Sequence, residues 1–146
     1  MRTAFITTLL ELAEKDKKIM LLTADMGYSV LEVFRDNFPN QFLNIGIAEA
    51  NMIGVASGLA LCGMKPYVYS IAPFVTMRCY EQIRNDVCCQ NVNVKIIGTG
   101  GGLCYGELGP THHSREDIAI MRVLPNIAVV CPGDPIETEL MLKESA

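Results

Sequence analysis

The chain has 146 residues, which is the length of one ordinary domain and too short for two well-packed cores. Half of its residues are hydrophobic and 19% are charged, a composition that excludes an intrinsically disordered segment. The net charge is −4 and charges of both signs are scattered along the sequence, which argues against a nucleic-acid or anionic-membrane surface.

Helical and strand-like hydrophobic patterns alternate from one end of the chain to the other. In chain order the patterns predict a helix over 3–12, a strand over 18–23, a helix over 29–37, a strand over 41–45, a helix over 49–61, a strand over 65–71, a helix over 74–89, a strand over 92–97, a helix over 114–121 with Ser114 as its N-cap, a strand over 127–130 and a last helix from 135 to 146. Short apolar strands that alternate with helices predict an α/β fold, a three-layer, doubly wound and mostly parallel sheet.

The six cysteines do not have the spacing of a disulfide framework or a zinc site. None forms a C-x-x-C pair, Cys88 and Cys89 are adjacent, and most lie in apolar segments. The N-terminus lacks a signal-peptide pattern and no apolar run approaches the roughly 20 residues that span a bilayer. We therefore expect reduced core thiols in a cytoplasmic protein.

Glu49 is the residue that says most about function. Ligands of open parallel sheets bind at the carboxyl ends of the strands, and Glu49 lies at such a predicted strand-to-helix junction with almost no other charge nearby. Burying a carboxylate there is costly unless it has a partner or is protonated. Two interpretations stay open: a carboxyl group that shares a proton with a ligand nitrogen, and a helix N-terminal glutamate that faces water.

The glycine-dense segment 98–102 does not match a phosphate-binding loop. The G-x-G-x-x-G register is broken at Leu103, no helix begins directly afterwards, and the chain has no Gly-Lys-Ser/Thr sequence. The segment is therefore interpreted as a flexible loop that comes close to another group, and not as a dinucleotide fingerprint.

The two histidines of the chain, His112 and His113, follow this loop. Adjacent side chains in a loop point in different directions and Glu116 is a poor third ligand, so a single histidine that hydrogen-bonds a polar substrate is favoured over a metal site. Phe74 stands at the start of the predicted helix 74–89, where it could pack in the core or form one wall of a flat-ring site.

Four segments of the chain resemble the transketolase family. The segment 44–60, which contains Glu49, resembles the glutamate motif of that family, and the segment 109–126, which begins Gly-Pro-Thr-His-His, resembles its second signature. The segments 24–29 and 78–84 match the family as well. The matches cover nearly the whole chain, in family order and at family spacing.

The chain is most similar to the pyrimidine-binding domain of a transketolase, in particular to the C-terminal subunit of the split, two-gene kind. The resemblance implies the thiamine diphosphate-binding fold of the pyrimidine-domain type, with 1–146 as a single domain and the C-terminal domain of the family absent. It also implies that thiamine diphosphate binds between subunits, while an N-terminal subunit or domain holds the diphosphate and Mg²⁺. We therefore expect a dimer or another homo- or hetero-oligomer, inactive without its partner.

On the cofactor side, the resemblance assigns Glu49 a hydrogen bond to the aminopyrimidine ring. Proton sharing there would favour the imino tautomer, whose nitrogen takes the proton from the thiazolium C2. The family pattern places Phe74 against the pyrimidine ring and assigns Asp25 and Arg78 to the cofactor site.

On the substrate side, the resemblance assigns Ser29 to a sugar-phosphate contact and His112 to a catalytic contact with a substrate hydroxyl or carbonyl oxygen. The chain departs from the family at two positions near His112. Leu108 stands where the family has an acidic residue that reads a donor hydroxyl, and Gly100 replaces a family histidine. These departures affect the substrate assignment and leave the cofactor role of Glu49 unchanged.

The sequence therefore predicts the pyrimidine side of a thiamine diphosphate site in a transferase that moves a two-carbon ketol unit between sugar phosphates. A 1-deoxyxylulose-5-phosphate synthase-like or 2-oxoacid dehydrogenase β-like subunit is an alternative, although segments 78–84 and 118–122 favour a split transketolase. A non-catalytic assembly domain of the same fold is a second alternative, favoured by Leu108 and Gly100. The broken glycine register argues against a third, a plain nucleotide-binding module.

Overall fold

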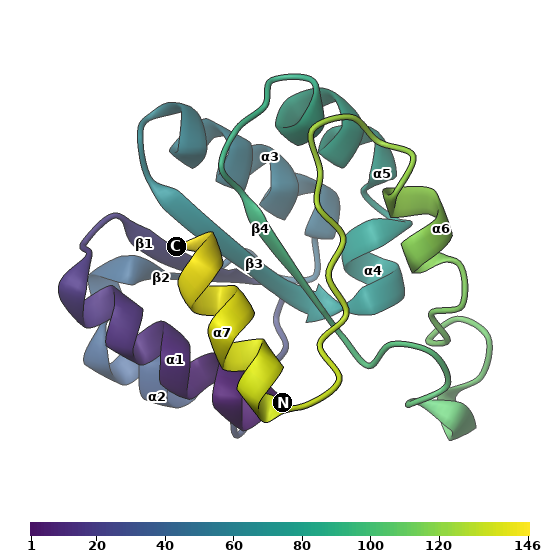
Figure 1. Ribbon diagram of the computed structural model, residues 1–146, viewed down its shortest axis with the longest axis horizontal. Helices are drawn as coiled ribbons and strands as arrows, with labels where there is room; N and C mark the ends of the chain where they lie inside the picture. Colours follow the sequence, from purple (N-terminus) through teal and green to yellow (C-terminus); the bar gives the residue numbers. More distant parts are fainter.

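Four parallel strands form the centre of the molecule, for which a computed structural model describes residues 1–146 (Figure 1). The strands are β1 (Ile19–Thr23), β2 (Phe42–Asn44), β3 (Lys65–Ile71) and β4 (Lys95–Thr99). Their order in the sheet is β2-β1-β3-β4, with Leu22 of β1 opposite Val68 of β3. The chain thus turns to opposite sides of β1, as in a doubly wound fold, and the predicted α/β class is confirmed.

Helices cover both faces of the sheet (Figure 1). One face carries α1 (Arg2–Lys15), α2 (Glu32–Asn37) and α7 (Pro135–Ser145), and the other carries α3 (Glu49–Leu61), α4 (Ala72–Thr76), α5 (Tyr80–Gln82) and α6 (Asp117–Met121). Each face has its own apolar core, and the side chains of successive β3 residues point alternately into the two cores. Tyr67 and Tyr69 pack with α1, whereas Val68 packs with α3, because side chains alternate along a strand.

The predicted fifth strand at 127–130 is wrong. The segment runs beside β4 without pairing to it, so that the sheet ends at β4 (Figure 1). Ile127 packs against the α3-side core, but Val129 and Val130 are 39% and 54% exposed. An apolar run of strand length supplies side chains for a core, but it does not by itself determine the backbone partner of the segment.

The predicted continuous helix over 74–89 is also wrong. The chain forms α4, breaks at residues 77–79, and resumes as α5 and a π-helical turn, η2 (Ile83–Cys88). The Thr76 hydroxyl donates to the Ala72 carbonyl at 2.6 Å and the Cys79 thiol donates to the Val75 carbonyl at 3.0 Å. Such bonds to carbonyls four residues back bend helices, and here they accompany the break that carries Arg78.

Ser114 does not cap a helix. The sixth helix begins three residues later, with Glu116 at its N-cap position, and Ser114 instead pairs with Gly102 through two backbone hydrogen bonds of 2.9 Å. This pair closes residues 103–113 into a loop that contains the 3₁₀ turn η3 (Gly106–Leu108) and both histidines. A second 3₁₀ turn, η1 (Pro39–Gln41), precedes β2.

The expectation of core thiols holds for two cysteines only. Cys79 and Cys88 are buried, and the other four are exposed: Cys62, Cys89, Cys104 and Cys131. Cys62 and Cys89 follow the ends of helical segments, and Cys104 and Cys131 lie in irregular chain. Apolar neighbours in the sequence therefore overstated the burial of these four side chains.

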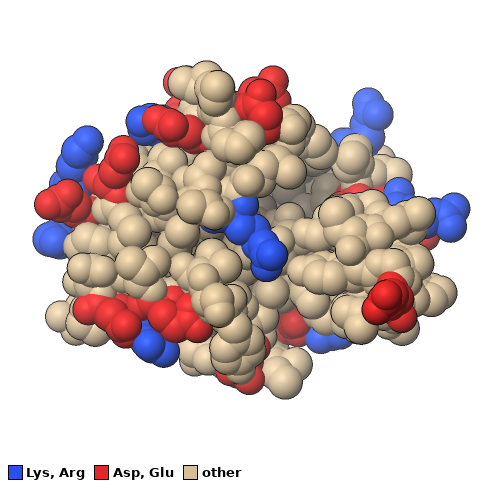
Figure 2. All heavy atoms as spheres, turned by 90° about the horizontal axis from the view of Figure 1, so that it is seen from below, with Lys and Arg blue, Asp and Glu red and all other residues tan.

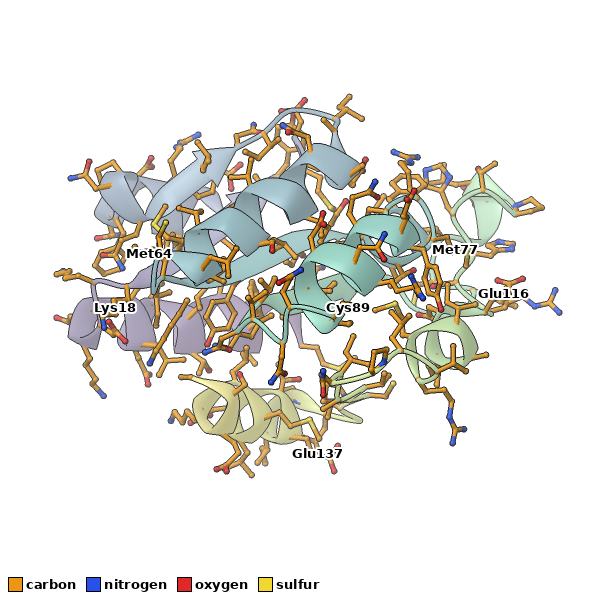
Figure 3. All side chains as sticks on the ribbon, turned by 90° about the horizontal axis from the view of Figure 1, so that it is seen from above. Lys18, Met64, Met77, Cys89, Glu116 and Glu137 are labelled. Atoms are coloured by element: carbon orange, nitrogen blue, oxygen red, sulfur yellow. The ribbon has the colours of Figure 1, made fainter.

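The two ends of the molecule carry different parts of the chain. Lys18 and Met64, which come just before β1 and β3, lie at one end, and Met77 and Glu116 lie at the other (Figure 3). Acidic and basic side chains are mixed on the face seen in Figure 2. None of the helices combines the length and apolar character needed to cross a bilayer.

Gln41 generates a prediction about stability. Its buried amide Nε2 lies 3.4, 3.2 and 2.9 Å from the carbonyl oxygens of Ala13, Asp16 and Ile19, and so joins the end of α1 to β1. We expect Gln41→Leu to lower the free energy of unfolding by about 2 kcal/mol, because buried acceptors lose their donor. Urea unfolding measures the loss. The neighbouring exposed Asn40→Leu is the control, and equal losses in the two variants would contradict the prediction.

Lys95 generates a prediction about pH. Its buried ammonium has no hydrogen-bond partner and lies 5.1 Å from the Tyr67 ring centroid, and burial lowers its pKa to about 8, with Lys65 contributing. The unfolded lysine keeps its proton to about pH 10.5, so between these values the unfolded state binds more protons and stability rises with pH. We therefore expect the unfolding free energy of the wild type to increase relative to that of Lys95→Met as the pH rises from about 7 to about 10. A difference that stays constant with pH would refute this.

Candidate active site

Glu49 is the first residue of α3 and its side chain is only 2% exposed. The chain reaches this position through a fixed turn, in which Gly46 has a φ of +77° and the Asn44 side-chain oxygen accepts hydrogen bonds from the amides of Asp25 (3.0 Å) and Gly46 (2.9 Å). The free amides of a helix N-terminus favour a negative charge there. The carboxylate therefore lies inside the protein at the carboxyl edge of the sheet, and the water-facing interpretation of Glu49 is wrong.

The buried carboxylate is paired with a partly exposed arginine. Arg78 Nη1 donates to Glu49 Oε2 at 2.8 Å, and the Arg78 side chain is 46% exposed. The Ser70 hydroxyl, at the end of β3, donates to the other oxygen at 3.4 Å. A charge-assisted hydrogen bond of this length satisfies a carboxylate that would otherwise be costly to bury. Glu49 Oε1 has only the long contact.

Aromatic rings continue from this ion pair into an open cleft. The Arg78 guanidinium carbon lies 4.1 Å from the centroid of the Phe74 ring, and the Phe74 and His112 rings meet edge to face with centroids 5.0 Å apart. The cleft has a volume of about 580 Å³ and is lined by Pro73, Phe74, Met77, Arg78, residues 110–113 and Glu116. The lining comes from two segments of the chain, 73–78 and 110–116. Figure 3 shows one residue of each, Met77 and Glu116, on the same side of the molecule.

Tyr105 is a site residue that the sequence reasoning missed. Its ring centroid lies 6.2 Å from that of His112. Gly100 has a φ of +74°, and a Cβ placed on it would lie 2.0 Å from Tyr105 Cε2, so the tyrosine ring fills the space where a side chain at position 100 would begin. The absence of a side chain at Gly100 was visible in the sequence, but the residue that fills the space five positions later was not.

Cys79 lies beneath the ion pair as a packed thiol. The residue is fully buried, and burial together with the nearby Glu49 charge raises its pKa to about 12. The thiol therefore keeps its proton at physiological pH, and without a thiolate it is no nucleophile.

Asp25 and Ser29 lie in the loop after β1, apart from this cluster. Both have positive φ angles, +52° and +61°. The Asn44 amide donates to Asp25 Oδ1 at 3.0 Å, and the Ser29 amide donates to Glu32 Oε1 at 3.0 Å. No hydrogen bond or ion pair joins either residue to Glu49, and no group of three His, Cys, Asp or Glu side chains gathers anywhere in the chain to hold a metal ion.

The structure thus brings four of the six predicted site residues together: Glu49, Phe74, Arg78 and His112. A flat ring that enters the cleft can stack on the Phe74 face and donate a hydrogen bond to the buried carboxylate, with His112 at the edge of the ring. The arrangement is suited to a nitrogen heterocycle more than to a phosphate. A phosphate would need a free cation, and the guanidinium of Arg78 is already paired with Glu49.

Comparison with known proteins shows the family of the chain. The family model described as transketolase, pyrimidine binding domain, matches residues 1–146. The chain is 43% identical over 143 residues to an apulose-4-phosphate transketolase subunit of Phocaeicola vulgatus, covering 97% of this chain and 46% of the relative. It is 40% identical over 142 residues to the 1-deoxy-D-xylulose-5-phosphate synthase of Desulfitobacterium hafniense, covering 97% of this chain and 22% of the relative.

A solved structure gives the same result for the fold. It is a split-gene transketolase described as an inactive β4 tetramer, with a TM-score of 0.88 and 40% identity over 99% of this chain and 46% of that one. The chain therefore spans less than half the length of these relatives. It belongs to the transketolase pyrimidine-binding domain family.

Proposed function

We propose that this chain supplies the pyrimidine side of a thiamine diphosphate site in a transketolase-like transferase, which moves a two-carbon ketol unit between sugar phosphates. The observation that carries the proposal is the carboxylate of Glu49, which is buried at the carboxyl edge of the sheet and is joined through Arg78 to the flat ring of Phe74. The names of the relatives, a transketolase subunit and a synthase of a keto-sugar phosphate, support the same class of chemistry.

The residues of the cleft fit an aminopyrimidine ring. Glu49 would hold a proton between its carboxyl group and a ring nitrogen, because a carboxylate with almost no access to water depends on a donor for its stability. Phe74 would orient the ring by stacking. When bound, thiamine diphosphate supplies the nucleophilic carbon and the electron sink that the protein lacks.

His112 would act on the substrate side of the ring. It lies 3.0 Å from the Thr111 hydroxyl and between the Phe74 and Tyr105 rings, which fix the orientation of the imidazole toward the cleft. A histidine held in this way can donate a hydrogen bond to a substrate hydroxyl or carbonyl oxygen. We assign Ser29 to a sugar-phosphate contact and Asp25 to the cofactor side of the subunit interface, both from the family pattern.

A partner chain or domain completes the proposed site and holds the diphosphate and Mg²⁺. Large apolar side chains are exposed in the loops at the carboxyl edge of the sheet: Tyr28, Ile47, Leu103 and Leu108. Helix α3 has few polar side chains, with space around Gly54 and Gly58 and an exposed Leu61. Surfaces of this kind are buried in assemblies. We propose an oligomer in the cytoplasm whose isolated pyrimidine-side chain is inactive, as the β4 tetramer of the split-gene relative is described to be.

The first test is Glu49→Gln in the reconstituted enzyme. The chain is combined with the N-terminal subunit of a split transketolase, with thiamine diphosphate and Mg²⁺ added. We expect kcat to fall by about 100-fold or more, because the amide cannot exchange a proton with the ring. The exposed Glu144→Gln is the control and should keep full activity. Equal activity of Glu49→Gln and wild type would refute the proton-sharing role.

The second test separates the proposed substrate class from its alternatives. We expect ketol transfer from a ketose phosphate to an aldose phosphate, measured by product mass, and no carbon dioxide release from pyruvate. Release from pyruvate with an aldose-phosphate acceptor would favour a 1-deoxyxylulose-5-phosphate synthase-like enzyme. Turnover of neither donor by a reconstituted complex that binds thiamine diphosphate would favour the assembly domain.

A further inference from the structure

Arg78 already makes both contacts that the proposed function assigns to the pyrimidine ring. Its Nη1 donates to Glu49 Oε2 at 2.8 Å, and its guanidinium carbon lies 4.1 Å from the Phe74 ring centroid. The guanidinium is flat, delocalised and donor-only, as are amidinium groups and the amidine part of a protonated aminopyrimidine. One side chain of this protein thus occupies the same carboxylate and the same ring face that a ligand would need.

The two partners of the ion pair differ in how firmly they are held. Glu49 is 2% exposed and belongs to the first turn of α3, so its carboxylate stays inside the protein. Arg78 lies within the helix break at residues 77–79 and its side chain is 46% exposed, so its guanidinium can turn into water without leaving a cation buried. If the pair opens, the arginine is therefore the partner that leaves, and Glu49 then needs another donor.

We propose that Glu49 and Phe74 form a binding site for flat, amidine-type groups, that Arg78 is its resident occupant, and that a ligand enters by displacing the Arg78 guanidinium. This inference rests on the proposed function where the ligand is the cofactor pyrimidine. It changes the role of Arg78 from a residue that holds the cofactor to one that competes with it. A ligand without a donor for Glu49 cannot replace the arginine, so the competition also selects the chemical class of the ligand.

The competition has a measurable consequence. The affinity for any such ligand is reduced by the fraction of molecules in which Arg78 vacates the site, and removing the side chain removes that reduction. An untethered guanidinium ion competes poorly with the tethered one, whose effective concentration is far higher. We thus expect the wild type to bind small amidine-type ions only weakly, and a variant without the arginine to bind them.

The test uses the full chain and two probes, followed by chemical-shift titration of labelled protein. The probes are 4-amino-5-hydroxymethyl-2-methylpyrimidine and methylguanidinium, with tetramethylammonium as an ion of equal charge that has no N–H donor. We expect Arg78→Ala to bind both probes at least about tenfold more tightly than wild type, and to bind tetramethylammonium no better. Arg84→Ala is the matched control, because the exposed Arg84 side chain bonds only its neighbour Asn85, and it should behave as wild type.

A second variant keeps the test decisive if Arg78→Ala misfolds because Glu49 has lost its partner. Arg78→Gln keeps a neutral donor for the carboxylate and loses the cationic contact with Phe74, and it too should bind both probes more tightly than wild type. In the wild type, the Arg78 guanidinium protons should exchange slowly with water and should exchange at the rate of Arg84 once Glu49→Gln is introduced.

Each outcome decides the inference separately from the proposed function. Equal binding by wild type and both Arg78 variants overturns the inference and leaves the cofactor assignment standing. Failure of both probes to bind a folded Arg78 variant overturns it as well. Binding of methylguanidinium but not of the aminopyrimidine by the variants supports the amidine site and argues against thiamine diphosphate as its ligand.

Discussion

The need of one buried carboxylate for a hydrogen-bond donor constrains the rest of the site. Glu49 has almost no contact with water, and its ion pair with Arg78 keeps the charge satisfied while the cleft beside it stays open. A buried pair of this kind is weak evidence for stability, because desolvation offsets much of the attraction. Its position at the ligand-binding edge of a parallel sheet, with one exposed partner, is better explained by function.

The architecture delivers these side chains from sequence positions that are far apart. Glu49 follows β2, Ser70 is the last but one residue of β3, Phe74 lies in α4, and His112 comes from the loop after β4. Parallel strands bring all of these junctions to one edge. Arg78 lies in the helix break at residues 77–79, and from there its guanidinium reaches Glu49 in α3. An irregularity of the backbone thus contributes directly to the site.

The parts of the fold that depend on local pattern could be predicted from the sequence, and those that depend on distant partners could not. The ranges 49–61 and 65–71 agree with α3 and β3 because apolar runs of 13 and 7 residues have the lengths of a helix and a strand, and Gly63 lies between them. The strand expected at 127–130 failed since pairing with β4 is decided by tertiary geometry. The apolar surroundings of Glu49 made it a candidate site residue and left its burial open, but its bond to Arg78, 29 residues away, and the filling of the Gly100 position by Tyr105 are contacts that no local pattern contains.

Without a bound ligand, the buried carboxylate of Glu49 needs a hydrogen-bond donor from the protein itself. An apolar replacement for Glu49 would remove that problem together with the chemistry, and an unpaired carboxylate would destabilise the fold. A flat cation on a flexible side chain satisfies the carboxylate and the Phe74 face at once, and it can leave when a better-shaped donor arrives. The exposed apolar loops around the same edge have no comparable internal solution, since burying Tyr28 or Ile47 requires a second surface. The charge of the proposed site is thus satisfied within this chain, whereas its exposed apolar loops need a second surface, as expected if the proposed partner binds there.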